Sequence, residues 1–356
     1  MTNGSPLIRL VHVTREFKTP AGVIKAVDDV SLDLDRGEAI CLVGESGCGK
    51  TTTGRLLAGL LRPTSGELLF EGNDVWRSRG ADQVRFRRAV QLVHQDPYAS
   101  LNPVRTVEQV LAAPLRHHRK AQTAKQARAA ARSLLQRVGL TPPDDFLHKF
   151  PHQLSGGQRQ RVSIARALTV DPRVIVADEA VSMVDVSIRI TLLDLLLGLR
   201  DEFGVSIVLI THDLAVARYF GRAGRIAVMY LGRVVELSAT QELIDDPAHP
   251  YATALIGAIP EADPDLTRSK QRLPLKSADV PSLLRLPPGC SFHPRCPRAE
   301  AGLCDVLVPA LTPIGGTRSV ACHVAVRERT ALAAATGPFR FDLPWVDIDK
   351  SEGSAG

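Results

Sequence analysis

A short apolar run that leads into a glycine-rich loop constrains the fold of this chain more than any other feature. Residues 39–43 read Ala-Ile-Cys-Leu-Val, and residues 44–51 follow at once as Gly-Glu-Ser-Gly-Cys-Gly-Lys-Thr. An apolar run of this length is typical of a buried strand. A loop with this spacing binds phosphate where it links such a strand to a helix. The segment therefore predicts a strand, a phosphate loop and a helix in succession.

Further apolar runs predict the rest of an α/β core. Residues 90–93, 174–177 and 205–210 are short and apolar, and helical patterns separate several of them. Continuous apolar strands are typical of parallel sheets that are covered on both faces. Strands that alternate with helices favour a doubly wound fold. We therefore expect a mainly parallel central sheet.

Other segments predict additions to this core. Residues 7–17, 27–34 and 66–70 alternate in a way that indicates an antiparallel β layer, and residues 96–170 read as a helical subdomain. A strand pair at 226–237, turning at Gly232, precedes a proline-rich stretch that reads as a linker. The expected division is a nucleotide-binding domain at 1–258, a small cysteine-bearing extension at 259–330 and a tail at 331–356.

The phosphate loop supplies the groups that a nucleoside triphosphate needs. Its glycines let backbone N–H groups approach phosphate oxygens, and the following helix offers its positive end. Lys50 brings a positive charge, and the hydroxyl of Thr51 can bind Mg²⁺. Cys48 is interpreted as a small filler of the loop rather than a redox group.

Polar residues at the ends of three predicted strands complete this chemistry. Asp178 and Glu179 follow residues 174–177, so the first can hold Mg²⁺ through water and the second can polarise an attacking water. His212 ends the next apolar strand and Gln95 follows residue 93, so both can reach the γ-phosphate region. Taken alone, His212 and Gln95 are weak signals, because such residues are often structural.

A second anion-binding surface is predicted at Leu154-Ser-Gly-Gly-Gln158. Ser155 is a suitable N-cap, and Gly156 and Gly157 leave the first N–H groups of a helix uncovered. One nucleotide does not need two such surfaces from one chain. We therefore expect this helix start to close on ATP that is held by the loop of a partner chain.

These motifs, in this order, resemble the ABC ATPase family of P-loop NTPases. The Walker A loop, the Q-loop glutamine Gln95, the signature at 154–158, Walker B at 174–179 and the switch histidine His212 cover about residues 7–250. The resemblance implies a head-to-tail dimer that encloses two ATP molecules, with Glu179 and His212 as catalytic residues. It implies Mg²⁺ ligands at Thr51, Gln95 and Asp178, and nucleotide contacts at Phe17, Gly44, Glu45, Ser46, Gly47, Cys48, Gly49, Lys50, Thr51, Thr52, Gln95, Ser155, Gly156, Gly157, Gln158, Asp178 and Asp185.

Phe17 and one altered segment qualify the resemblance. Phe17 stands where the family places an aromatic ring on adenine, and the less favoured alternative is a core phenylalanine of the first strands. Relatives usually read Asp-Glu-Pro-Thr-Ser-Ala-Leu-Asp after the Walker B strand, whereas residues 180–184 here read Ala-Val-Ser-Met-Val. The acids and Asp185 are retained, so we expect hydrolysis, and we expect the altered packing to affect communication across the dimer.

Within the family, the chain resembles ATPases of dipeptide and oligopeptide importers. The stretch Gln-Asp-Pro-Tyr-Ala-Ser-Leu-Asn-Pro at 95–103, the triplet His-Pro-Tyr at 249–251 and the late cysteine motif at 290–297 carry this likeness to about residue 326. Nickel and some sugar importers belong to the same subfamily, so the cargo stays open. The resemblance implies two transmembrane permeases, a second ABC ATPase and an extracytoplasmic solute-binding protein as partners.

The location of the chain is also an expectation. No stretch approaches the roughly 18 to 20 apolar residues that span a bilayer, and the first ten residues do not resemble a signal peptide. We therefore expect a peripheral protein at the cytoplasmic face of the inner membrane.

Two rival functions are weighed against transport. The net charge of +6 would suit a non-transport ABC ATPase that binds nucleic acid. The chain, however, has one cassette and no long coiled-coil insertion, and its cysteine cluster follows the cassette, so we expect no nucleic acid partner. A binding subunit without turnover is suggested only by residues 180–184.

Four late cysteines predict a metal centre. Cys290, Cys296, Cys304 and Cys322 are separated by five, seven and seventeen residues in a proline-rich segment with little core to fill. The short pairs of zinc ribbons are absent, which favours a [4Fe–4S] cluster over Zn²⁺. A mixed zinc site with His293 and His323 is the alternative.

Overall fold

The computed structural model describes residues 5–96, 100–182, 184–222, 224–259 and 273–336. Parts of four predicted features lie outside the described residues: Pro97, Tyr98 and Ala99 of the 95–103 stretch, Met183 of the altered segment, residues 260–272 of the extension, and residues 337–356 of the tail.

Eight strands of the described residues form one large sheet, and their order across it is β11 (Thr312–Gly315), β12 (Arg318–Val320), β10 (Arg233–Ala239), β9 (Arg225–Tyr230), β3 (Ala39–Val43), β8 (Ser206–Ile210), β7 (Val174–Asp178) and β6 (Val90–Val93). From β9 to β6 the strands are parallel, and from β9 to β11 they are antiparallel. β3, β7 and β8 are buried along their whole length, as their apolar sequences require.

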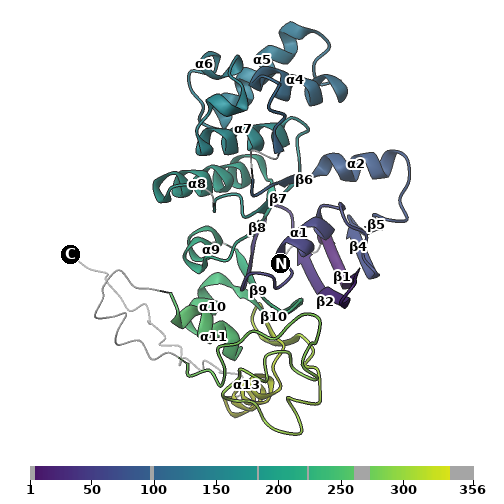
Figure 1. Cartoon of the computed structure of the whole chain (residues 1–356), viewed down its shortest axis with the longest axis vertical. Coiled ribbons are helices and arrows are strands. Elements are labelled where there is room, and N and C mark those ends of the chain that lie inside the picture. Colours follow the sequence, from purple (N-terminus) through teal and green to yellow (C-terminus); the bar gives the residue numbers. More distant parts are fainter. Residues whose placement is uncertain (1–4, 97–99, 183, 223, 260–272, 337–356) are drawn as a thin grey trace, which may run out of the picture.

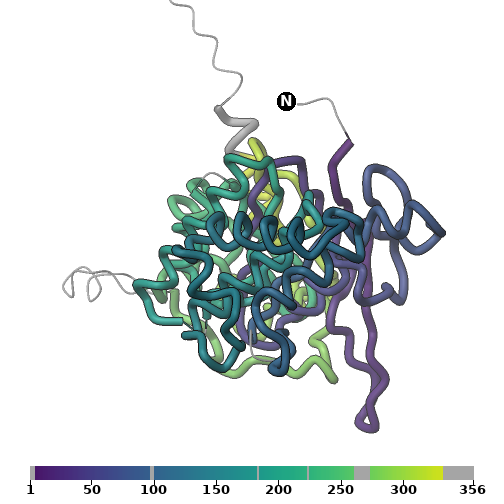
Figure 2. The backbone as a smooth tube through the Cα atoms, turned by 90° about the horizontal axis from the view of Figure 1, so that it is seen from above, coloured from purple at the N-terminus to yellow at the C-terminus, as the bar shows by residue number. Residues whose placement is uncertain are grey.

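A second sheet of four strands, counted over the described residues, is antiparallel and carries β2 (Gly22–Leu34), β1 (Ile8–Thr19), β4 (Ser65–Phe70) and β5 (Asn73–Asp74). This is the predicted antiparallel layer, and its β1–β2 hairpin projects from the body of the protein (Figure 2). Helix α1 (Lys50–Leu57) packs against both sheets and buries Leu56 and Leu57 between them. The phosphate loop is thereby fixed between two layers.

The helical region lies at one end of the molecule (Figure 1). It contains α4 (Val107–His117), α5 (Ala124–Arg137), α6 (Asp144–Leu147), a 3₁₀ turn (Pro151–Gln153) and α7 (Gly156–Leu168). Thr106 and Thr123 begin α4 and α5 with capping boxes, in which a glutamine three residues later bonds back to the threonine N–H. Helix α2 (Ala81–Ala89) leads from the antiparallel layer into β6.

Four more helices cover the central sheet and continue toward the extension. α8 (Val186–Phe203) and α9 (Leu214–Gly221) flank β8 in the chain, and α10 (Thr240–Asp245) and α11 (Pro250–Gly257) follow β10. The side chains of α8 that face the core are leucines, such as Leu192 and Leu196, with no exposed area. These contacts join the helices to the apolar cluster that also contains β3 and β7.

The C-terminal extension contributes two strands to the central sheet. β12 pairs with β10 through Ser319 and Val320, so the extension continues the central sheet. These strands are short and carry polar residues, which is why their sequence does not predict them. The expected tail from 331 also begins inside a helix, α13 (His323–Thr336).

Among the helices of the described residues, none is both long and apolar enough to cross a membrane.

Candidate nucleotide site

The phosphate loop is shaped by close backbone approaches. A Cβ atom on Gly44 would lie 2.2 Å from the carbonyl oxygen of Met229, and one on Gly49 would lie 2.1 Å from that of Ala26. Both glycines also have positive φ angles, 153° and 102°, which other residues rarely adopt. The glycines therefore let the loop pass between β9 and β2 and direct it to the start of α1.

Lys50 lies inside the curve of this loop. Its side chain is buried, and Nζ donates hydrogen bonds to the carbonyl oxygens of Gly44 at 2.8 Å and Glu45 at 2.9 Å. Cys48 is buried beside it, and burial raises the pKa of the Cys48 thiol. The thiol therefore stays protonated, as expected of a filler residue.

The first acidic residue contacts the loop directly. The hydroxyl of Thr51 donates a hydrogen bond of 3.0 Å to Oδ1 of Asp178, which ends β7. Burial raises the pKa of the Asp178 carboxyl, the charge of Glu179 raises it further, and the Thr51 hydrogen bond opposes both effects. Thr51 of α1 and Asp178 at the end of β7, two of the three predicted Mg²⁺ ligands, are thus adjacent.

Glu179 lies at the centre of a three-residue contact. Its Oε2 accepts a hydrogen bond of 2.8 Å from Nε2 of Gln95, and its Oε1 lies 3.1 Å from Nδ1 of His212. Its backbone φ is 47°, in the left-handed region, where a residue other than glycine is strained and functional sites are over-represented. The ends of β6, β7 and β8 therefore bring Gln95, Glu179 and His212 together, at the edge where parallel α/β sheets bind ligands.

A cavity of about 460 Å³ opens beside these residues, and its lining is Thr51, Arg55, His94, Gln95, Asp96, Ser100, Arg166 and Asp178. Arg55, His94 and Arg166 are absent from the predicted site. Burial and the charge of Arg166 lower the pKa of His94. A sequence signal exists for two of them, since His94 precedes Gln95 and Arg166 belongs to the helix that follows the signature.

The signature residues form the start of α7. Ser155 Oγ accepts a hydrogen bond from the backbone N–H of Gln158 at 3.3 Å, and the Gln158 side chain accepts one from the Ser155 N–H at 3.0 Å. Gly157 faces Ile188, where a Cβ would lie 2.6 Å from a methyl group. In the part of the chain that the structure describes, no hydrogen bond links residues 155–158 to the phosphate loop.

Two further predicted contacts lie apart from the loop. Phe17 is half-buried on β1, and the Arg15 guanidinium lies 4.8 Å from its ring centroid. Phe17 is therefore not a fully buried core residue. Asp185 is exposed at the start of α8.

The altered segment after Glu179 is packed into the core. Ala180 and Val181 are buried in the cluster that contains β3 and β7. The Ser182 hydroxyl donates a hydrogen bond of 2.8 Å to the carbonyl oxygen of Glu179. The Ser182 backbone N–H donates to the same oxygen at 3.0 Å, so the segment supports the strained backbone of Glu179 with apolar contacts and two hydrogen bonds.

The four late cysteines lie within electrostatic reach of one another. Burial raises the pKa of Cys290 to about 11, and the charges of Cys322, Cys296 and Cys304 raise it further. Within the described residues, however, no group of three or more His, Cys, Asp or Glu side chains is placed to hold a metal ion. The [4Fe–4S] cluster therefore stays a prediction.

Each of the two histidines of the alternative zinc site has one ring nitrogen within hydrogen-bond distance of a backbone carbonyl oxygen. Nδ1 of His293 lies 3.0 Å from the carbonyl oxygen of Cys290, and Nε2 of His323 lies 2.9 Å from that of Leu307. Among the described residues, the other ring nitrogen of each histidine has no hydrogen-bond partner.

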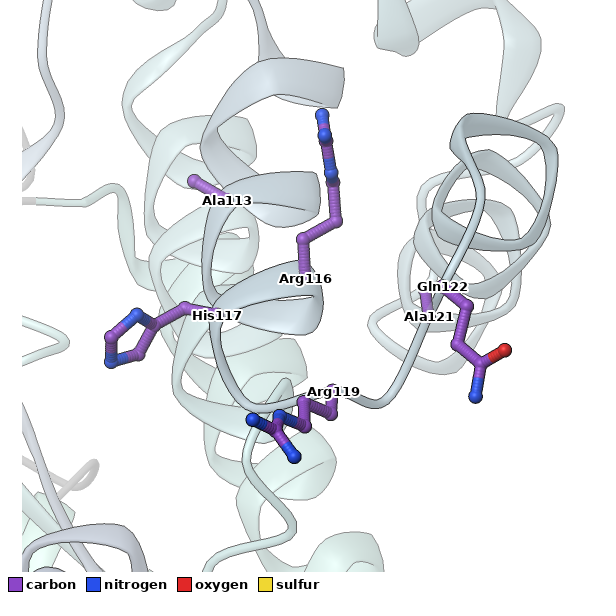
Figure 3. A pocket seen from close by; sticks show the side chains of 6 residues that line it. All are labelled: Ala113, Arg116, His117, Arg119, Ala121 and Gln122. Carbon is purple, nitrogen blue, oxygen red and sulfur yellow. The ribbon is translucent and has the colours of Figure 1, made fainter.

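A separate cavity of about 650 Å³ lies at the end of α4, lined by Ala113, Arg116, His117, Arg119, Ala121 and Gln122 (Figure 3). Arg116, His117 and Arg119 are exposed. This basic region is part of the helical region and belongs to α4 and the turn after it.

The strand, loop and helix unit, with Asp178 and Glu179 at the end of β7 on the far side of β8, defines a P-loop NTPase. The ABC transporter family matches residues 27–182, and the oligopeptide/dipeptide transporter C-terminal region matches residues 235–304. The chain belongs to the ATP-binding proteins of the ABC transporter family and is an ABC ATPase, which confirms the predicted fold, family and enzyme class.

Two relatives illustrate the similarity. The probable peptide ABC transporter ATP-binding protein y4tS of Sinorhizobium fredii is 47% identical over 308 residues, which cover 86% of this chain and 85% of the relative. The dipeptide transport ATP-binding protein DppF of Escherichia coli is 42% identical over 329 residues, which cover 91% of this chain and 96% of the relative.

Solved structures resemble the cassette part of the chain. One is the ATP-binding cassette MJ0796, in a dimeric post-hydrolysis state bound to ADP and Pi. It matches with a TM-score of 0.59 at 32% identity, and the match covers 65% of this chain and 98% of the MJ0796 chain. CbiO1 from Clostridium perfringens has a TM-score of 0.58 at 25% identity and covers 68% of this chain and 92% of that one.

Proposed function

We propose that this chain is the ATP-hydrolysing subunit of an importer for dipeptides or oligopeptides. The observation that carries the hydrolytic part is the contact of Glu179 with Gln95 and His212 beside the Thr51–Asp178 pair. The peptide part is supported by the matched C-terminal region and by the names of the relatives, which are peptide transport proteins.

The chemistry is assigned residue by residue. Backbone N–H groups of the loop and Lys50 bind the phosphates of ATP. Thr51, Asp178 and Gln95 would hold Mg²⁺, which neutralises charge on the phosphate oxygens when bound. Glu179 orients the attacking water and accepts its proton. His212 contacts the same carboxylate and so sets its position.

The complete site requires a second ATPase chain. Ser155 to Gln158 have no hydrogen bond to the phosphate loop among the described residues, so we infer that they bind ATP held by a partner. The dimeric cassette bound to ADP and Pi supports this arrangement. Phe17 would lie against adenine, and Asp185 would lie near the dimer contact.

The remaining partners and the location follow from the same proposal. We infer two transmembrane permeases, an extracytoplasmic solute-binding protein and a position at the cytoplasmic face of the inner membrane. The nucleotide-binding domain would comprise residues 1–258 and the extension residues 259–330. A nickel or other small-solute importer is the second candidate.

We also propose that Cys290, Cys296, Cys304 and Cys322 hold a [4Fe–4S] cluster, with Zn²⁺ as the alternative. The support is the chemistry of the donor set, since burial and the neighbouring cysteines raise the pKa of the thiols of Cys290, Cys296 and Cys322. A bound cluster would cross-link the loops of the extension.

The test is transport by the assembled complex. This chain is co-expressed with its neighbouring permease and ATPase genes, reconstituted in vesicles, and assayed for ATP hydrolysis with the solute-binding protein and a panel of ligands. We expect dipeptides or oligopeptides to stimulate hydrolysis more than Ni²⁺ or sugars. Stimulation by Ni²⁺ alone would replace the peptide assignment, and no hydrolysis with any ligand would remove the motor function.

A further inference from the structure

The C-terminal extension contacts the phosphate loop through an ion pair. Nη1 of Arg295 donates hydrogen bonds to both carboxylate oxygens of Glu45, at 3.1 and 3.0 Å, across 250 residues of sequence. Glu45 is the second residue of the loop, between Gly44 and Ser46. Two residues that are far apart in the sequence thus meet where the phosphates of ATP are expected.

Arg295 is held firmly in place. Only 6% of its area is exposed, its N–H donates to the carbonyl oxygen of Phe292 at 3.0 Å, and its own carbonyl oxygen accepts from the Lys276 N–H at 3.0 Å. The guanidinium lies 5.7 Å from the ring centroids of both Tyr230 and Phe292. A buried charge in such a position needs its partner, because an unpaired buried charge is strongly destabilising.

A second contact holds the same loop residue from another element. The backbone N–H of Glu45 donates a hydrogen bond of 2.9 Å to the hydroxyl of Tyr251 in α11. The Tyr251 ring packs against Phe292, with ring centroids 5.4 Å apart, and Phe292 belongs to the same turn as Arg295. The side chain and the backbone of Glu45 are therefore both fixed by one buried cluster.

We propose that Arg295 is a positioning residue for ATP, which holds the phosphate loop in its binding conformation through Glu45. The inference goes beyond the proposed function but rests on its assignment of the nucleotide site. The physical reason is preorganisation: a loop that is already ordered loses less conformational freedom when ligand binds. Through this pair the extension is part of the nucleotide site.

A purely structural role makes a different prediction. If the pair only attached the extension to the cassette, its loss would lower the unfolding temperature without changing the affinity of the folded protein for ATP. If the pair positions the loop, the affinity falls in protein that is still folded. The loop binds phosphates in the ground state and the transition state alike, so KM for ATP rises while kcat changes little.

The experiment is a double-mutant cycle on the full chain. Kd for ATP, KM, kcat and the unfolding temperature are measured for Arg295→Gln, Glu45→Gln and the double variant. Arg327→Gln is the matched control, because it breaks an exposed ion pair with Glu300 in the same extension. Lys50→Ala reports on the nucleotide site itself, and Arg295→Lys tests rescue by a retained charge.

We expect Arg295→Gln to raise Kd for ATP by about 3- to 30-fold. Because the two residues act as a unit, the Kd of the double variant should not exceed that of the single variant that binds ATP more weakly. Arg295→Lys should lie between Arg295→Gln and the wild type. Arg327→Gln should leave Kd unchanged. The kcat of Arg295→Gln at saturating ATP should stay within about threefold of wild type.

Two outcomes overturn the inference while leaving the site assignment intact: Arg295→Gln with the same Kd as Arg327→Gln, or single effects that simply multiply in the double variant. If Lys50→Ala binds ATP normally, the proposed site itself is wrong. If Arg295→Gln does not fold, Glu45→Gln and Tyr251→Phe replace it, since both keep most of the buried volume and each removes one contact of the cluster with Glu45. An unchanged Kd in both would then refute the positioning role.

Discussion

The side-chain amide of Gln95 donates a hydrogen bond of 2.8 Å to Glu179. Gln95 follows β6 and Glu179 follows β7, so the hydrogen bond joins two neighbouring strand ends. His212, after β8, contacts the other carboxylate oxygen at 3.1 Å. The position of the Glu179 carboxylate is therefore set from both sides by residues that the parallel sheet brings to one edge.

Glu179→Gln should lower turnover without weakening ATP binding. The substitution keeps the shape of the side chain and removes the group that accepts a proton from water, so we expect kcat to fall by about 10² to 10⁴. Steady-state hydrolysis and a nucleotide-binding assay measure the two effects. A fully active Glu179→Gln protein would remove Glu179 from this role.

Lys50→Ala should weaken ATP binding itself. The Lys50 ammonium lies inside the phosphate loop, so its loss removes a charge that binds phosphate. Kd for ATP is measured by titration with a fluorescent nucleotide. The matched control is Lys125→Ala, since Lys125 is exposed on α5, and equal affinities of the two variants would contradict the assignment.

His249 should make the protein less stable as pH falls. Burial lowers the pKa of His249 to about 3, whereas an unfolded histidine has a pKa of about 6.5. The unfolded state therefore binds the additional proton between these values. The contribution of neutral His249 to the free energy of unfolding is complete above about pH 6.5. It is lost as the pH falls toward about 3, at up to about 1.4 kcal/mol per pH unit.

The measurement for His249 is the unfolding temperature at several pH values between 7.5 and 5.5. Nδ1 of His249 accepts a hydrogen bond of 3.0 Å from the Tyr251 N–H and caps α11. His249→Asn can keep this cap without titrating in the range. We expect a smaller pH dependence in the variant than in wild type, and identical slopes would refute the role of His249.

The cysteine extension should yield iron after anaerobic purification. We expect a brown protein that absorbs broadly near roughly 400 nm, with about four irons per chain, and loss of both signals in the double variant Cys296→Ser/Cys304→Ser. Cys41→Ala, in β3 and outside the extension, should retain the iron. A colourless chain with stoichiometric zinc would establish the alternative and leave the ATPase assignment intact.

The dimer in the cell should contain two different ATPases. The motivation is the segment 180–184, which departs from the family pattern beside Glu179 and could fit a different partner. Affinity purification of this chain from its native host, followed by mass spectrometry, identifies the partner. Recovery of this ATPase as the sole ATPase with the permeases would contradict the prediction.

The sequence alone determined the central fold and the identity of the nucleotide motifs. In residues 39–51 a strand is followed directly by the phosphate loop, and in residues 174–179 a strand is followed directly by the two acidic residues. Each motif is continuous in the sequence, so its local pattern is sufficient to predict it. The structure places Asp178 beside Thr51 because parallel strands end at the same edge. The sequence does not predict β11 and β12, because these short polar strands lack an alternating apolar pattern. They are stabilised by pairing, β12 with β10 and β11 with β12.

Only the tertiary structure decided how the extension meets the site. Glu45 reads as a variable position of the phosphate loop, and Arg295 reads as part of a cysteine motif. Neither has a sequence signal for the other, because their contact depends on β9, α11 and the turn at Phe292 packing together. A contact across 250 residues is a property of the packed core, which no local spacing encodes.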